Sequence, residues 1–275
     1  MGIGGLWVHR IDRCEGGPAG IIAACIATGA DRLIVKCRDG RSAYNEKEIG
    51  ILASMAMAEG IPFFPWAWPY STEKHGDPGY IDAQATRIAE DARRLGAAGV
   101  ILNIEAPFSW GYGHRWADRH ADQYGSKQAR RAALRERTRE LLTTTRSGID
   151  SAILCVSTFP TPSAHALAFD IMAKLSDEIL PQCYFKGHGW ESKTAKAIGQ
   201  WKKLEAKVIR FTGPGWRGPT KMRSMAAAVR LVQGLDAPID WWVLDKMDPR
   251  ELDAAAALMG GQCPVTSYSV LIRPG

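Results

Sequence analysis

Residues 99–105 of the chain, Gly-Val-Ile-Leu-Asn-Ile-Glu, decide the fold prediction. Gly99 ends a helical pattern, and the short apolar run after it is typical of a parallel strand covered on both faces. Because side chains alternate along a strand, Asn103 and Glu105 share one face. A carboxylate at the end of an apolar strand is costly unless water or a ligand meets it. We therefore expect Glu105 at the edge where a parallel barrel carries its catalytic groups.

Similar apolar runs alternate with helical patterns along the whole chain. The predicted strands are Gly5–Arg10, Arg32–Lys36, Ile61–Trp66, Gly99–Ile104, Ser151–Val156, Glu178–Tyr184, Lys207–Phe211 and Ile239–Leu244. The predicted helices are Pro18–Thr28, Asn45–Glu59, Pro78–Leu95, Lys127–Ser147, Ala164–Leu175, Ser192–Lys203, Thr220–Gln233 and Pro249–Met259. Four glycines that follow helical patterns suit left-handed helix caps: Gly29, Gly60, Gly96 and Gly148.

Eight strand–helix units with right-handed crossovers predict an α/β protein with a single (β/α)8 TIM barrel. No linker-like stretch divides the chain, so we expect one domain over residues 1–275 with a short tail at 260–275. A doubly wound sheet is the alternative. It would need a glycine-rich turn after the first strand, and Cys14-Glu15-Gly16-Gly17 matches that turn poorly.

Composition narrows the function classes. The net charge is +6, and much of it lies in the segment Lys127–Arg146, where glutamates are interleaved. This pattern predicts a solvated amphipathic helix, with a groove for nucleic acid as the alternative. The 6 cysteines form no metal-binding pattern, so we expect neither a metal nor a cofactor.

Targeting signals are not recognisable in the sequence. The N-terminus does not resemble a signal peptide, and no apolar run reaches the roughly 18 residues of a membrane span. We therefore expect synthesis in the cytoplasm and no membrane partner. A phage-encoded lysin, released without a signal, would fit this pattern.

The loops after barrel strands gather at one face, and here they contain many of the 10 tryptophans. Aromatic platforms beside hydrogen-bonding groups are suited to sugar rings, whereas tryptophans that merely cover the barrel are the alternative. The chain is thus expected to bind a carbohydrate polymer or oligosaccharide. The candidate substrate-binding residues are Asp12, Lys36, Trp66, Trp68, Asn103, Trp110, Gln182, Arg210 and Trp216.

Glu105 is the candidate general acid, and an ion pair with Lys36 or Arg210 is its structural alternative. A glycosidase also needs a second group, and three carboxylates follow predicted strands. Tyr184 is placed to bond a substrate group from the sixth strand. The candidate second carboxylates are Asp12, Asp39 and Asp245.

Three segments resemble barrel-fold glycoside hydrolases of the chitinase-like and lysozyme-like kind. Residues 99–105 are similar to their fourth-strand Asp-x-Glu, with Glu105 at the acid position. Residues 181–184, Pro-Gln-Cys-Tyr, resemble a sixth-strand segment with an inward tyrosine. Residues 35–40 resemble a second-strand Lys-x-x-Asp-Gly segment. The resemblance implies hydrolysis of an N-acetylated or cell-wall polysaccharide such as peptidoglycan.

Two departures from the family pattern keep other functions open. Asn103 stands where the family has an aspartate, and the predicted seventh strand has no carboxylate for a nucleophile. Glu105 would then work with substrate assistance or with one of the three aspartates. The main alternative is a non-catalytic glycan-binding or structural module, for example in a phage particle. A barrel enzyme that uses Lys36 or Lys246 on a small metabolite is a third possibility.

Overall fold

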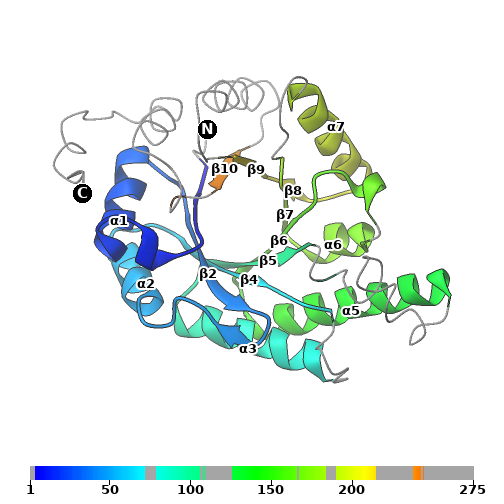
Figure 1. Ribbon diagram of the computed structural model, residues 1–275, viewed down its shortest axis with the longest axis horizontal. Helices are drawn as coiled ribbons and strands as arrows, with labels where there is room; N and C mark the ends of the chain where they lie inside the picture. The colour runs from blue at the N-terminus through cyan, green and yellow to red at the C-terminus, as the bar shows by residue number, and fades with distance from the viewer. Residues whose placement is uncertain are drawn as a thin grey trace.

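Strands and helices alternate along the chain, and the strands form a ring with the helices outside it (Figure 1). The computed structural model describes residues 4–71, 79–105, 108, 126–165, 167–183, 190–214, 238–242 and 244. The strands are β1 Leu6–Val8, β2 Leu33–Asp39, β3 Ser42–Ala43, β4 Phe63–Trp68, β5 Gly99–Ile104, β6 Ile153–Thr158, β7 Glu178–Pro181, β8 Val208–Ile209, β9 Phe211–Pro214 and β10 Ile239–Trp242. The helices are α1 Gly17–Thr28, α2 Ile49–Ala58, α3 Tyr80–Arg94, α5 Lys127–Gly148, α6 Phe169–Leu175 and α7 Trp190–Lys203, with short 3-10 turns at Ile11–Arg13 and Pro162–Ala164.

Parallel pairing closes the ring in the order β8-β7-β6-β5-β4-β2-β1-β10-β9. Strands β8 and β9 are two parts of one path that is interrupted at Arg210. The first part pairs with β7 and the second with β10. A bridge between Gln182 and Thr212 also joins β9 to the end of β7. The protein is therefore an α/β (β/α)8 TIM barrel, as predicted, and the doubly wound alternative is wrong because the β8–β9 path pairs with β7 on one side and with β10 on the other, which closes the sheet.

The seventh strand differs most from its prediction. It was expected to end at Phe211, but its second part continues to Pro214 because β10 provides a partner there. The helices predicted at 220–233 and 249–259, and the tail at 260–275, lie outside the described residues. Among the described helices, none is long and apolar enough to cross a membrane.

Most barrel strands are covered on both faces, which explains the continuous apolar runs in the sequence, and β8 is the exception because Val208 is exposed. Outward residues such as Val100 and Leu102 pack against the helices in a large core. Inward residues form a second, separate cluster that fills the middle of the barrel. Its buried members are Trp7, Ile34, Phe64, Trp66, Ile101, Cys155 and Leu180.

The glycines predicted as helix caps behave in two ways. Gly29 ends α1 in the left-handed region with a φ of 64°, as predicted, and Gly60 and Gly96 also have positive φ values. Gly148 does not act as a cap, because it is the last residue of α5 and has no positive φ. A Cβ atom at Gly148 would lie 2.6 Å from the Cβ of Ala89, so this glycine allows α5 to approach α3.

The basic helix predicted around Lys127–Arg146 is α5, and ion pairs occupy several of its arginines. Arg135 contacts Asp170 of α6 at 2.6 Å, and Arg139 contacts Glu136 one turn away at 2.5 Å. Both pairs are exposed, as on a solvated helix surface.

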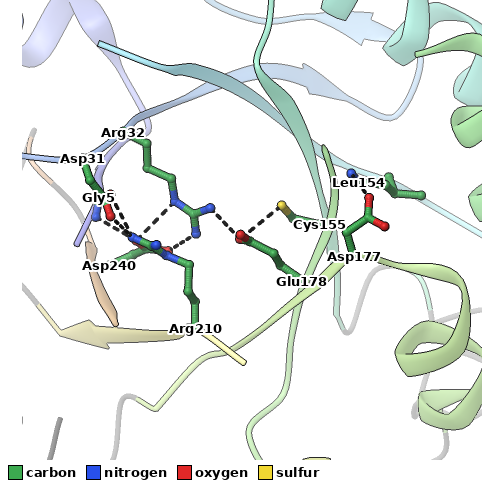
Figure 2. A network of polar contacts seen from close by, with 9 residues as sticks. All are labelled: Gly5, Asp31, Arg32, Leu154, Cys155, Asp177, Glu178, Arg210 and Asp240. Carbon is green, nitrogen blue, oxygen red and sulfur yellow. Dashed lines mark hydrogen bonds and ion pairs between the residues drawn. The ribbon is translucent and has the colours of Figure 1, made fainter. Parts of the chain in front are cut away.

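A network of charged side chains closes the barrel at the N-terminal ends of the strands (Figure 2). We call its members, Asp31, Arg32, Glu178, Arg210 and Asp240, the barrel floor. Arg32 contacts Asp240 at 2.5 Å and Glu178 at 2.6 Å, and Arg210 contacts Asp31 at 2.7 Å and Asp240 at 3.1 Å. Burial opposes ionisation of Asp240, but the two guanidinium groups outweigh it and lower the pKa of this carboxyl to about 2.

Candidate active site

Polar side chains meet at the opposite end of the barrel, where β2, β5, β6 and β7 finish. We call this end the mouth of the barrel. Glu105 directly follows β5, and its carbonyl accepts a 3.0 Å hydrogen bond from the backbone N–H of Phe108, which fixes the turn after the strand. Asn103 and Ser157 are register partners on β5 and β6. Asn103 and Glu105 were predicted to share one face, and both contact the side chain of Gln182.

Gln182, which follows β7, connects the ends of β5, β6 and β7. Its side-chain N–H2 donates to the carboxylate of Glu105, to Oδ1 of Asn103 at 2.7 Å and to Oγ of Ser157 at 3.1 Å. The structure therefore brings Glu105, Asn103 and Gln182 together, three residues that were selected separately from the sequence. Lys36 and Arg210, the expected ion-pair partners of Glu105, contact other carboxylates.

The environment of Glu105 favours a proton donor over a bare carboxylate. Burial raises the pKa of Glu105 above its ordinary value, and the hydrogen bonds from Gln182 and Asn103 partly oppose this increase. The net shift is upward. A carboxyl group with this balance retains its proton closer to neutral pH than a solvated glutamate does.

Lys36 lies on β2, which β4 separates from β5. Its side chain is buried within an aromatic cage. Its side chain is 1% exposed, and its ammonium group lies 4.2, 5.2 and 5.1 Å from the ring centres of Tyr44, Trp66 and Trp68. The same ammonium group donates to Oδ2 of Asp39 at 2.7 Å. An amine that is paired and enclosed in this way is not poised to attack a carbonyl, which argues against Lys36 as a nucleophile. Lys246, the other lysine of that alternative, lies outside the described residues.

A β-bulge brings Asp39 to the same side of the sheet as Lys36. On a regular strand, residues three apart point to opposite faces. Here Lys36 pairs with Trp66 and Arg38 with Ala67, so Cys37 is one extra residue in β2. Arg38 turns outward and contacts Asp91 of α3 at 2.6 Å, while Asp39 follows one residue later beside Trp68.

The two described tryptophans of the predicted sugar-binding face have different environments. Trp66 is 1% exposed, and its indole N–H donates to the carbonyl of Val8 at 3.1 Å, so it forms part of the packed interior. Trp68 is only partly buried. Its indole N–H is buried and has no hydrogen-bond acceptor among the described residues, so the ring and not the N–H is what Trp68 presents at the mouth. We therefore retain Trp68 as the candidate stacking residue.

Asp12 lies at the edge of the mouth. It is exposed and accepts hydrogen bonds of 2.9 and 2.5 Å from Arg10. It borders a cleft of about 460 Å³. Tyr44, one of the aromatic residues around Lys36, also lines this cleft. The structure thus places Asp12 beside the site, at its solvent side.

Arg210 lies at the other end of the barrel from Glu105. Its guanidinium group is held by Asp31 and Asp240 in the barrel floor (Figure 2). We therefore leave Arg210 out of the site. Four further candidates lie outside the described residues: Trp110, Tyr184, Trp216 and Asp245.

Two residues that the sequence-based selection did not include complete the site. The hydroxyl of Tyr70 donates to Oδ1 of Asp39 at 2.7 Å, and the alternation Trp66, Trp68, Tyr70 could have indicated its direction. Asn45 was expected to begin a helix, but α2 begins at Ile49. Instead, the side-chain amide of Asn45 donates to the carbonyls of His9 and Lys36 at 3.0 and 2.9 Å and joins the ends of β1 and β2.

Comparison with known proteins gives the class of fold. No family model matches the chain, and no curated protein matches it. Among solved structures, the chitinase from Chromobacterium violaceum has a TM-score of 0.64 at 10% identity and covers 94% of this chain and 99% of its own. The spore cortex-lytic enzyme SleL of Bacillus megaterium has a TM-score of 0.60 at 12% identity over 92% of this chain and 73% of its own. The catalytic domain of a Streptomyces mannanase has a TM-score of 0.58 at 12% identity over 96% and 86%. At these identities the likeness shows a shared (β/α)8 fold.

Proposed function

We propose that this protein is a glycoside hydrolase in which Glu105 is the general acid. One observation carries the proposal: a carboxyl group with a raised pKa lies at the C-terminal end of a barrel strand, oriented by Gln182 and Asn103. Catalytic residues of TIM-barrel enzymes lie at this end of the strands. None of the charged residues described around Glu105 pairs with it, so its proton remains available for transfer.

Glu105 would donate its proton to the glycosidic oxygen as the bond to the anomeric carbon breaks. Proton donation by a positioned side chain contributes about 10²–10⁴-fold to the rate. The raised pKa of Glu105 supports this role because the group must be protonated when the substrate binds. Trp68, which is only partly buried, would pack its ring against a sugar ring.

The substrate class follows from the same site and from the similar structures. Those structures are of a chitinase, a cortex-lytic enzyme and a mannanase, all of which act on glycan polymers. We infer that this chain acts on a polysaccharide, and an N-acetylated or cell-wall glycan is the first class to test.

Glu105→Gln tests the proposal because it keeps the shape of the side chain and removes the acidic proton that the mechanism requires. Purified protein would be incubated with chitohexaose and with peptidoglycan sacculi, and new reducing ends would be measured. We expect turnover to fall about 10²–10⁴-fold while glycan binding is retained. Glu136→Gln, a matched change in an exposed ion pair on α5, serves as the control. Equal hydrolysis by the Glu105 variant and wild type would refute the assignment.

A non-catalytic glycan-binding module, in a phage particle or other surface assembly, is the second candidate. Asn103 favours it, because an amide beside Glu105 cannot share a proton with it as the aspartate of the resembled family would. The absence of any carboxylate from residues 208–214 favours it as well. Saturable binding of chitohexaose by wild-type protein, without reducing ends after long incubation, would select this function.

A further inference from the structure

The proposed reaction needs a second group, and Asp39 is the described carboxylate best placed to provide it. The bulge in β2 sends Arg38 outward and Asp39 to the mouth, in register with Trp68. Bulges of this kind re-aim single side chains and occur often beside active sites. If residues 36–39 formed a regular strand without the bulge, Asp39 would lie on the face that packs against the helices.

Asp39 is held rigidly but is not sealed. Its Oδ2 accepts from the ammonium group of Lys36 at 2.7 Å, and its Oδ1 accepts from the hydroxyl of Tyr70 at 2.7 Å. The side chain of Asp39 is 31% exposed, whereas that of Lys36 is 1% exposed. A molecule in the mouth would therefore meet the carboxylate and not the ammonium group. Each carboxylate oxygen still has a second lone pair for a water molecule.

The strand order sets the spacing between Asp39 and Glu105. Strand β4 lies between β2 and β5, so the two strand ends are two interstrand spacings apart, or about 10 Å. Retaining glycosidases separate their carboxyl groups by about 5–5.5 Å, whereas inverting enzymes use about 6.5–9.5 Å to admit a water molecule. Side chains that project toward the barrel axis from these strands fit the wider class.

We propose that Asp39 is the general base of an inverting glycosidase, an inference that rests on the proposed function. Asp39 takes a proton from water as a lone pair of the water oxygen forms a bond to the anomeric carbon. The glycosidic bond breaks, its electron pair stays on the leaving oxygen, and that oxygen takes the proton of Glu105. The products are two sugars with inverted configuration at the new reducing end, a protonated Asp39 and an ionised Glu105. Exchange with solvent then restores both carboxyl groups.

The opposite surroundings of the two carboxyl groups support this division of roles. Among the described residues, Glu105 contacts amide side chains and no cation, while Asp39 contacts an ammonium group and a phenol. The two carboxyl groups are thus held by chemically different partners, as an acid and a base with separate roles require. Lys36 and Tyr70 act through Asp39 and are positioning residues in this scheme.

The experiment follows the configuration of the first product of chitohexaose hydrolysis by proton NMR, before mutarotation. Wild-type protein should release the inverted anomer, and a retained anomer would overturn the proposal without any variant. Asp39→Asn should lower kcat about 10²–10⁴-fold, and Asp170→Asn, which breaks an exposed ion pair, is the matched control. Asp39→Ala with added azide should yield a glycosyl azide of inverted configuration.

The outcomes distinguish this inference from the proposed function. If wild-type protein cleaves neither chitohexaose nor peptidoglycan, the hydrolase proposal fails and the role of Asp39 with it. If Glu105→Gln removes activity but Asp39→Asn stays within about threefold of wild type, only the role of Asp39 is overturned. Thermal unfolding of each variant shows whether lost activity reflects lost fold.

Discussion

Asp240→Asn tests whether the barrel floor stabilises the fold. Asp240 is fully buried and accepts hydrogen bonds from Arg32 at 2.5 Å, from Arg210 at 3.1 Å and from the backbone N–H of Gly5 at 2.7 Å (Figure 2). An asparagine side chain keeps one oxygen acceptor but turns N–H donors toward a guanidinium group. Each arginine then keeps only its other carboxylate, Glu178 for Arg32 and Asp31 for Arg210, and the network loses the one negative charge that both arginines share.

The expected loss can be worked out from the pKa of Asp240. Its value of about 2, against an ordinary 3.8, corresponds to about 2 kcal/mol of stabilisation at about 1.4 kcal/mol per pKa unit. Because the folded-state pKa is lowered, this stabilisation is present above about pH 4 and is lost as the pH falls toward 2. Removing one partner of a buried pair typically costs about 3–5 kcal/mol. We therefore expect the variant to lose about 3 kcal/mol at pH 7.

Urea unfolding followed by tryptophan fluorescence measures this loss. Asp170→Asn, which breaks an exposed pair with Arg135, should cost less than about 1 kcal/mol. The difference between wild type and Asp240→Asn should shrink as the pH is lowered from 7 to 2. A loss no larger than that of the control, or a difference that does not change with pH, would refute the reasoning.

Three further predictions concern the site and the packing around it. Gln182→Leu removes a hydrogen bond that lowers the pKa of Glu105, so the alkaline limb of the pH–rate profile should move to higher pH, and an unmoved limb would contradict this role. Because the pKa of Glu105 is raised, ionisation of this group at pH values above its ordinary pKa of 4.5 lowers the stability of the fold. Glu105→Gln should thus be about 0.5–2 kcal/mol more stable at pH 7, with the gain vanishing below about pH 4.5, and a less stable variant in urea unfolding would argue against burial of the charge. Gly148→Ala places a Cβ 2.6 Å from that of Ala89 and should cost about 1–3 kcal/mol, whereas an unchanged melting temperature would show that α3 and α5 separate easily.

The barrel itself could be predicted because its strands carry local signals. The strand expected at Gly99–Ile104 has these same bounds in the structure, since a glycine and a charged residue delimit its apolar run. The position of Glu105 at the strand end followed from the same run. The contact between Glu105 and Gln182 could be expected only in part. The sequence places both residues at one end of the barrel, but it does not show that they come within hydrogen-bonding distance.

Features that depend on strand pairing could not be predicted. Simple alternation puts Lys36 and Asp39 on opposite faces, and only the register against β4 reveals the bulge that unites them. Arg210 was assigned to the mouth because the seventh strand was expected to end beside it. Its partners Asp240 and Asp31 are 30 and 179 residues away in the sequence, so no local pattern indicates the barrel floor.

The packed interior has a consequence for how a polymer would be handled. Trp7, Phe64 and Leu180 belong to the cluster that blocks the lumen, and the barrel floor lies beneath them. A long glycan therefore has no passage through the ring to follow from one cut to the next. It must lie across the rim or enter by one end, and after each cleavage the fragments must withdraw along the route of entry. Repeated cutting would then require sideways sliding or release and rebinding, so its rate should depend on how quickly the products leave.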